Sequence, residues 1–302
     1  MNREEILQAV KDYTLIDDTE METLVHNLID NVQDNDICGN IHGYDFTWLK
    51  KYYEINTTPT YSTGHVSVVQ DSTTVTGNGT TFTSAMVGRV IKFSGDSEYY
   101  LILAFVSVTE ITLQTAYIGT TLADSDYIIY CVNYALPSDF KRMEYIKQVG
   151  YKSDIPKMND RQFSTLYPDE FETVGQEILG YIEGNMDSSS NRQIRFYPVQ
   201  IIRKRVYLGY IKKLPTINTT GATSLVPSRY HNLFVFKLAE EVYRMNDMES
   251  KAQSAKDRLD DLLYKAIVED KNAFEDEKDV MSDEDIYKNV SKAHSVNLPI
   301  NI

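Results

Sequence analysis

The sequence predicts an α+β fold in which a small all-β domain is inserted into a helical bundle. Apolar residues recur every three or four positions over the first sixty residues and again after Pro227, which is the spacing of amphipathic helices. Between residues 61 and 135 the period changes to two, with many β-branched residues and regular turn signals. That pattern is typical of a small barrel or sandwich.

Three helices are expected in residues 1–60. The first has Ile6, Val10 and Tyr13 on one face. In the second, Thr19 is a suitable N-cap because Glu22, three residues later, completes a capping box. A third helix is predicted from about residue 45 to residue 55. Its apolar side consists of Trp48, Leu49, Tyr52 and Tyr53.

The inserted β domain at 61–135 is expected to contain several short strands. Asn78-Gly79 lies between β-branched runs and predicts a hairpin turn. Gly95-Asp96 and Asp124-Ser125 predict two more turns. The remaining strands are expected at 90–93, 99–106, 110–113 and 127–132.

After the insertion, the helical body is expected to resume over 136–268. Ser138 follows Pro137 and is predicted to cap a short helix. A second, short β element is predicted at 193–211. One helix should follow Pro227, and a long final helix should carry Ala252, Ala255, Leu259, Leu262, Leu263 and Ala266.

Residues 269–302 are predicted to form an acidic tether and an extended docking tail. The stretch 269–285 is strongly acidic and cannot bury much surface by itself. The last residues are apolar at every second position, which favours docking on a partner by strand addition or in a groove; a frayed terminus is the alternative. The expected docking residues are Val296, Leu298, Ile300 and Ile302.

The sequence contains no signature of catalysis. It has no phosphate-binding glycine loop, no nucleophile elbow and no metal-binding histidine helix. The two cysteines, Cys38 and Cys131, are too few for a disulfide framework or a metal site. We therefore expect no enzyme activity, no metal and no cofactor. We also expect no export and no membrane association, because no apolar run approaches the ~18 residues of a spanning helix.

One basic stretch stands out in a chain whose net charge is −14. That overall charge disfavours a protein that grips nucleic-acid phosphates. The basic stretch could contact a neighbouring subunit or partner, form a solvated sheet face, or contact DNA directly. Its residues are Arg192, Arg195, Arg203, Lys204, Arg205, Lys212 and Lys213.

An ordered series of short motifs over residues 20–265 resembles the head-to-tail connector (adaptor) proteins of tailed phages, including the tail tubular protein A type. Each motif is loose, and their order and spacing carry the resemblance. The main ones are Trp48-Leu49-Lys50-Lys51, Thr73 to Phe82, Val87-Gly88-Arg89, Tyr134 to Phe140, Arg195-Phe196-Tyr197-Pro198 and Pro227-Ser228-Arg229-Tyr230-His231.

The resemblance implies a subunit that assembles with itself into a ring, commonly of twelve copies, in the neck of the virion. Such a ring lies beneath the portal protein and extends the DNA channel. It also offers a platform for tail, nozzle or further ring proteins. Double-stranded DNA would pass through without sequence-specific binding.

Three rival functions remain open. The chain could be another neck, tail-ring or head-completion protein of a phage. It could be a glycan-binding adhesin whose β domain exposes Tyr99, Tyr100 and Tyr117 as contacts. A cell-wall hydrolase would need an organised pair of carboxylates, which the sequence does not indicate.

Overall fold

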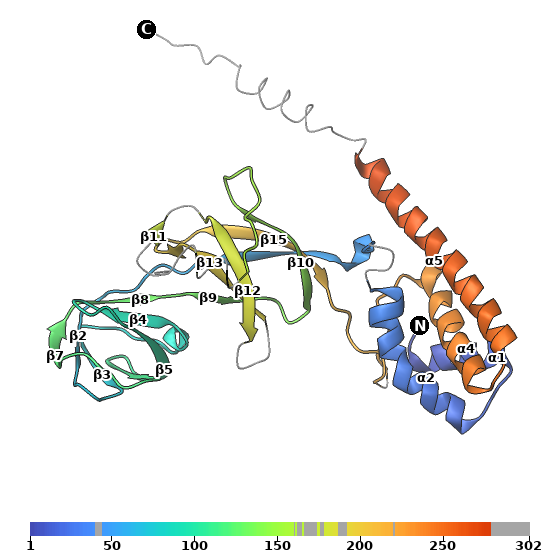
Figure 1. The fold of residues 1–302 in the computed structure, drawn as a ribbon, viewed down its shortest axis with the longest axis horizontal. Helices are drawn as coiled ribbons and strands as arrows, with labels where there is room; N and C mark the ends of the chain where they lie inside the picture. Colours follow the sequence, from blue (N-terminus) through green and yellow to red (C-terminus); the bar gives the residue numbers. More distant parts are fainter. Residues whose placement is uncertain are drawn as a thin grey trace, which may run out of the picture. The chain divides into compact units, whose positions relative to one another are not determined.

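The computed structural model describes residues 1–39, 44–159, 161, 165, 174–175, 178–186, 192–219 and 221–278. These residues form a mixed α+β fold with four α-helices and a curled seven-stranded antiparallel sheet (Figure 1). The chain divides into two compact units. The helical unit comprises residues 1–50 and 212–302, and the β unit comprises residues 51–211.

The helical unit begins with two capped helices. Asn2 caps the first helix, and its side chain and that of Glu5 form a reciprocal capping box. Asp18 caps the second helix by accepting a hydrogen bond from the backbone of Met21, so the predicted cap at Thr19 is wrong by one residue. The helices and short helical turns are α1 (Arg3–Thr14), α2 (Thr19–Asn31), the π-helix η1 (Val32–Ile37), η2 (Thr47–Leu49), η4 (Ser228–Tyr230), α4 (Asn232–Met245) and α5 (Glu249–Lys278).

Helix α4 is the central element of the helical unit, because α1, α2 and α5 all pack against it. Its residues Leu233, Phe234, Leu238 and Val242 are fully buried. Ala252 and Ala255 on α5 are small enough for a close approach to Ala239 and Tyr243. The two helices predicted after Pro227 are therefore confirmed.

Two further predictions are wrong. Residues 45–55 do not form a helix: after η2 the chain becomes the strand β1 (Lys50–Asn56). Consecutive aromatic and β-branched residues suit a strand, and pairing with a distant strand decides the outcome. The tether predicted at 269–302 is wrong over residues 269–278, because α5 continues to Lys278 and Asp270 is only 2% exposed.

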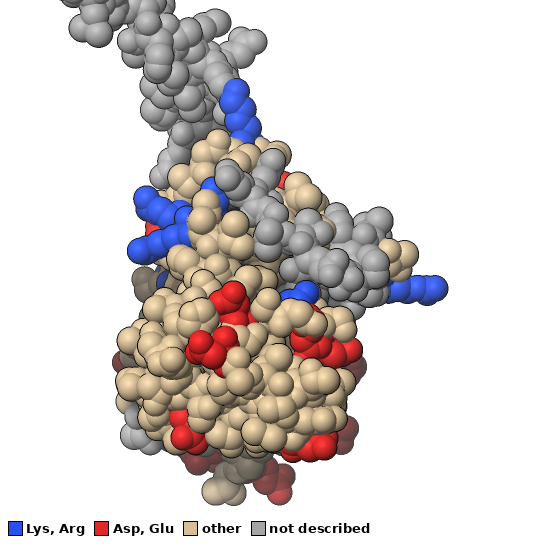
Figure 2. Space-filling model, turned by 90° about the vertical axis from the view of Figure 1, so that its left-hand side faces the viewer, with Lys and Arg blue, Asp and Glu red and all other residues tan. Residues whose placement is uncertain are grey.

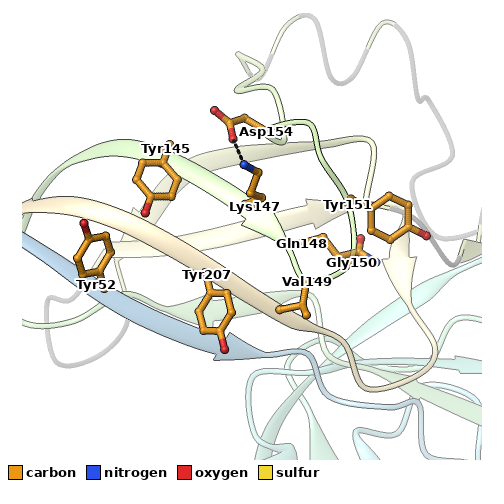
Figure 3. Close-up of a pocket in the computed structure, with 9 residues that line it drawn as sticks. All are labelled: Tyr52, Tyr145, Lys147, Gln148, Val149, Gly150, Tyr151, Asp154 and Tyr207. Atoms are coloured by element: carbon orange, nitrogen blue, oxygen red, sulfur yellow. Dashed lines mark ion pairs between the residues drawn. The ribbon is translucent and has the colours of Figure 1, made fainter. Parts of the chain in front are cut away.

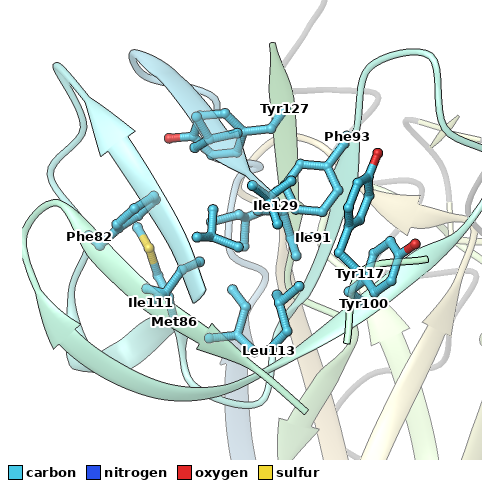
Figure 4. Close-up of a cluster of buried hydrophobic side chains, with 14 residues drawn as sticks. Phe82, Met86, Ile91, Phe93, Tyr100, Ile111, Leu113, Tyr117, Tyr127 and Ile129 are labelled. Atoms are coloured by element: carbon cyan, nitrogen blue, oxygen red, sulfur yellow. The ribbon is translucent and has the colours of Figure 1, made fainter. Parts of the chain in front are cut away.

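The curled sheet corresponds to the predicted β domain. Its strand order is β7-β2-β3-β6-β5-β4-β8. Alternate residues point inward and form one core of fourteen buried side chains, including Phe82, Ile91, Phe93 and Ile129 (Figure 4). The strands are β2 (His65–Val68), β3 (Thr74–Asn78), β4 (Val90–Phe93), β5 (Tyr99–Ser107), β6 (Glu110–Leu113), β7 (Leu122–Ser125) and β8 (Tyr127–Tyr130), with η3 (Ser84–Met86) between β3 and β4.

The hairpin predicted at Asn78-Gly79 is wrong in position. The β2–β3 hairpin turns between Val68 and Val75, which are paired, and Asp71 supplies the left-handed residue (φ 63°). Asp can adopt this conformation nearly as readily as Asn. Asn78 instead ends β3. The turn at Gly95-Asp96 is confirmed between β4 and β5, whereas Asp124 and Ser125 lie in β7, which pairs with β2.

The rest of the β unit is larger than the short element predicted at 193–211. It contains two three-stranded sheets, β1-β15-β10 and β12-β13-β9, and the pair β11-β14. The short helix predicted at Ser138 is wrong, because the chain makes a turn there and enters β10. The strands are β9 (Asn133–Ala135), β10 (Phe140–Gln148), β11 (Val174–Gly175), β12 (Gly180–Met186), β13 (Arg192–Tyr197), β14 (Val199–Gln200) and β15 (Arg205–Lys212).

Candidate functional site

A groove lined by tyrosines lies on the outer face of the β1-β15-β10 sheet (Figure 3). Side chains alternate across β15, so Val206, Leu208 and Tyr210 enter the core while Arg205 and Tyr207 point the other way. The groove has a volume of about 760 Å³. It is lined by Tyr52 from β1, Tyr207 from β15, Tyr145, Lys147 and Gln148 from β10, and Val149, Gly150, Tyr151 and Asp154 from the segment after β10.

A glycine shapes the floor of this groove. Gly209 lies on the middle strand, and the ring of Tyr145 occupies the space that a side chain would fill: a Cβ at position 209 would come 2.4 Å from that ring. The missing side chain lets Tyr145 approach Tyr52 across the middle strand, with ring centroids 6.5 Å apart. Burial beside Tyr52 raises the pKa of Tyr145, so the hydroxyl stays protonated at neutral pH.

The tyrosine surface is open to solvent. Tyr52 is 72% exposed, and Tyr207, Tyr151 and Val149 are also exposed. Aromatic side chains with a polar end are enriched at protein interfaces. They bury a large area and lose little conformational entropy on binding, because they have few rotatable bonds. A row of such residues on a sheet whose other face is core is therefore suited to binding a partner.

Ion pairs within the chain neutralise the charges at the groove's rim. Arg205 donates hydrogen bonds to both carboxylate oxygens of Glu54, at 3.1 and 2.8 Å, and its guanidinium lies 5.5 Å from the centre of the Tyr207 ring. These hydrogen bonds lower the pKa of Glu54 to about 2. Lys147 pairs with Asp154 at 3.8 Å. The rim thus attracts neither sign of charge strongly.

The predicted basic stretch does not form one surface. Arg192 and Arg195 lie on β13, Arg203 and Lys204 precede β15, and Lys212 and Lys213 lie at its far end. An eight-residue strand separates its ends by roughly 23 Å. Arg203 and Arg205 are tied to β1 through Asn56 and Glu54, and Arg195 donates to Asn133. Of these seven residues, Arg205 contacts the groove, because it donates a hydrogen bond to the hydroxyl of Tyr207.

The tyrosines expected as glycan contacts in the curled sheet are mostly interior. Tyr100 is 3% and Tyr117 is 1% exposed, and both belong to the core of that sheet. Tyr99 is half-buried. The prediction placed Tyr99 and Tyr100 on a strand correctly, and Tyr117 lies between β6 and β7. Burial excludes Tyr100 and Tyr117 as surface contacts. The end of the sheet seen in Figure 2 is mainly uncharged, with scattered acidic side chains.

The described part of the chain contains no group of three His, Cys, Asp or Glu residues able to hold a metal ion. No helix within it is long and apolar enough to cross a membrane. Cys38 and Cys131 are not joined in a disulfide. The predicted docking residues Val296, Leu298, Ile300 and Ile302 lie outside the described residues.

No protein-family model matches the chain, and a search of curated proteins likewise gives no match.

Sequence reasoning missed the tyrosine groove. Tyr52 was assigned to the apolar side of a helix, and Tyr145, Tyr151 and Tyr207 were not singled out. A usable signal was present: Arg205 to Tyr210 alternates polar or aromatic with apolar residues, and Gly209 interrupts the outer face. A glycine inside a strand often marks a close approach by another group.

Proposed function

We propose that this protein is a structural subunit of the neck of a tailed phage, a head-to-tail adaptor that assembles as a ring beneath the portal. The observation that carries the proposal is the exposed tyrosine groove on the β1-β15-β10 sheet, which suits contact with another protein. The ordered motifs between residues 20 and 265 supply the particular family.

The fold agrees with this use in its broad plan. The resemblance implies helices carrying a β domain, and the chain has a four-helix unit and a curled sheet. In the proposed ring the four helices form the bundled body, and the curled sheet is a barrel-like or sandwich-like domain. Residues after Lys278 act as a tether that anchors the subunit to the portal or to another ring component.

Charge supports the same proposal. The helical unit has 16 Lys and Arg against 27 Asp and Glu, and the β unit has 14 against 17. The helical unit is therefore the more acidic by a wide margin, at −11 against −3. A ring whose helical units face the channel would repel packaged DNA and let it slide. Repeated contacts between unlike surfaces of neighbouring copies would close such a ring.

The test is assembly of the full chain with the portal protein encoded in the same genome. Mass photometry and negative-stain electron microscopy should show a closed ring of the chain on the portal, with about twelve copies as the resemblance implies. A variant ending at Lys278 should stay folded but fail to join the portal. Ending at residue 269 would be a poor choice, because it removes Asp270, which binds Tyr44 and Thr47.

Absence of any complex with the portal would contradict the adaptor proposal. If the chain forms a ring but binds a different neck or tail protein, the alternative of another ring or head-completion protein holds instead.

The tyrosine groove also favours a second candidate, glycan binding, because open tyrosine rings beside polar groups can stack on sugar rings. A glycan array and isothermal titration with the full chain would test it. Micromolar binding by a monomer, abolished by Tyr52→Ala, would support the glycan candidate.

A further inference from the structure

We propose that the tyrosine groove binds residues 296–302 of a second copy of this chain. This inference deepens the proposed function, on which it rests, by naming the occupant of the groove. The segment is Val296-Asn297-Leu298-Pro299-Ile300-Asn301-Ile302, and the groove is the one lined by Tyr52, Tyr145, Tyr207, Val149 and Tyr151.

The first argument is the fit of side-chain chemistry. Grooves lined by aromatic rings suit extended peptides, because the rings bury apolar side chains that project from one side of the peptide. The segment places Val296, Leu298, Ile300 and Ile302 at alternate positions, and alternate side chains of an extended peptide point the same way. Leu298 and Ile300 flank Pro299 and would lie against the tyrosine rings.

The second argument is charge. The ten residues 293–302 contain no Asp, Glu, Lys or Arg, whereas residues 279–285 contain four acids. The groove is matched to an uncharged ligand, since Arg205 is neutralised by Glu54 and Lys147 by Asp154. Burying an unpaired charge there would carry a large desolvation cost. Among the residues beyond Lys278, the uncharged apolar end is therefore the part that the groove accepts.

The third argument is reach. Seventeen residues, 279–295, separate the end of α5 from the proposed docking segment. An extended chain of that length spans up to about 55–60 Å, enough to cross to a neighbouring subunit. A tail of one copy in a groove of the next is a head-to-tail contact, and contacts of that kind close rings.

The experiment is site-specific photo-crosslinking in the full chain. Tyr52 is replaced by the photoreactive residue p-benzoylphenylalanine, and a matched control carries the same replacement at Tyr53, the next residue on β1, whose side chain points to the opposite face. Mixing 15N-labelled and unlabelled chains at about 100 μM, where contacts of micromolar Kd are occupied, lets mass spectrometry separate crosslinks between copies from those within one copy.

We expect position 52 to capture peptides containing residues 296–302 from the other copy, at least about tenfold more than position 53 does. Leu298→Ser with Ile300→Ser should reduce that capture about tenfold, a loss equivalent to ~1.4 kcal/mol. Asn297→Ser with Asn301→Ser, which alters the alternate face of the same segment, should change it little. Circular dichroism of each variant checks that the chain remains folded.

The proposal is overturned if position 52 captures no tail peptide, captures it only within one chain, or captures it equally in the Leu298→Ser, Ile300→Ser variant. Binding of a neutral oligosaccharide that blocks the groove, with no tail crosslink, would overturn it in favour of the glycan. The crosslink is measured in the isolated protein, without the portal. It can therefore be absent while assembly with the portal succeeds, or present while assembly fails, and the two proposals are tested independently.

Discussion

Two sheets of the β unit use their tyrosines in opposite ways. Inside the curled sheet, Tyr100 of β5 and Tyr117 of the segment after β6 point inward and complete a core with Phe93. In the β1-β15-β10 sheet, Tyr52 and Tyr207 point away from the core and remain open. The curled sheet encloses these rings in its core, whereas the outer face of the β1-β15-β10 sheet carries an open groove. A tyrosine's role in this protein therefore depends on which face of which sheet it occupies, and not on its place in a period-two pattern.

Removing a core side chain from the curled sheet should produce the largest effect. Ile129 is fully buried, lies opposite Ile91 of β4 and exchanges two backbone hydrogen bonds with Tyr61. Ile129→Ala should therefore lower the free energy of unfolding by about 3–4 kcal/mol through lost contacts and a cavity. Tyr52→Ala, on the open face, should change it by less than about 0.5 kcal/mol. Hydrogen exchange measured by mass spectrometry checks both values, on peptides from β5 and β8 for Ile129→Ala and on peptides from β1 and β15 for Tyr52→Ala. Equal losses of stability in the two variants would show that the tyrosine face of the β1-β15-β10 sheet is packed as tightly as the core of the curled sheet.

Adding a side chain at the floor of the groove should cause a smaller loss of unfolding free energy. Gly209→Ala places a Cβ 2.4 Å from the Tyr145 ring, so the ring must move, at a cost of about 1–3 kcal/mol. The matched control is Gly184→Ala in β12, where a Cβ meets nothing within 4 Å. NMR of ring-labelled tyrosine would report the displacement of Tyr145. If Gly209→Ala costs no more than Gly184→Ala and leaves that signal in place, the glycine does not shape the groove.

The sequence predicted those features that depend on local spacing. Helices α1, α2, α4 and α5 follow from apolar periodicity, and Val90–Phe93 and Glu110–Leu113 follow from alternation. The β1-β15-β10 sheet could not be predicted in the same way. In this sheet β15 pairs with β1, about 155 residues away in the chain, and with β10, about 65 residues away. Pairing at such distances depends on the whole fold. Tyr52 was accordingly assigned to a helix.

The candidate site was still harder to predict than the fold. The seven basic residues lie within the short range 192–213, which suggests that they form one surface. In the structure, however, Arg205 and Lys212 lie at opposite ends of β15. The groove depends on Gly209 lying opposite Tyr145, which is a matter of register between two strands. The register between two such distant strands is set by tertiary packing, so a local sequence pattern does not predict it.

Charge at the start of β15 offers a third comparison. Arg203 is exposed and Lys204 half-buried just before β15. If this end of the strand meets an acidic neighbour, Arg203→Glu with Lys204→Glu should weaken ring formation about tenfold, or ~1.4 kcal/mol per contact. Lys251→Glu with Lys256→Glu on α5 makes the same change of charge and should have a smaller effect. Mass photometry at two salt concentrations gives the measurement. Normal assembly by the first variant would leave this basic group as a solvated surface.

The smallest expected effect concerns the ion pair at the groove's rim. Hydrogen bonds from Arg205 hold the pKa of Glu54 at about 2, below its value of roughly 4.3 in an unfolded chain. A folded-state pKa below the unfolded one stabilises the fold fully above about pH 4.3, and this stabilisation disappears as the pH falls through about 2. Because the pair is exposed, solvent and salt screen it. Glu54→Gln should therefore lower the thermal midpoint only slightly at pH 7, and less still in high salt.

The difference between the thermal midpoints of wild type and Glu54→Gln should be constant from pH 8 to pH 5 and shrink between about pH 4.3 and pH 2, because Glu54 becomes protonated over that range. Calorimetry across this series checks the sign as well as the size. A difference that grows with acidity would mean that the carboxylate is destabilised in the folded state. The rim would then carry a charge that is not neutralised within the chain. Such a rim would favour a charged ligand, and the charge argument for the uncharged segment 296–302 would fail.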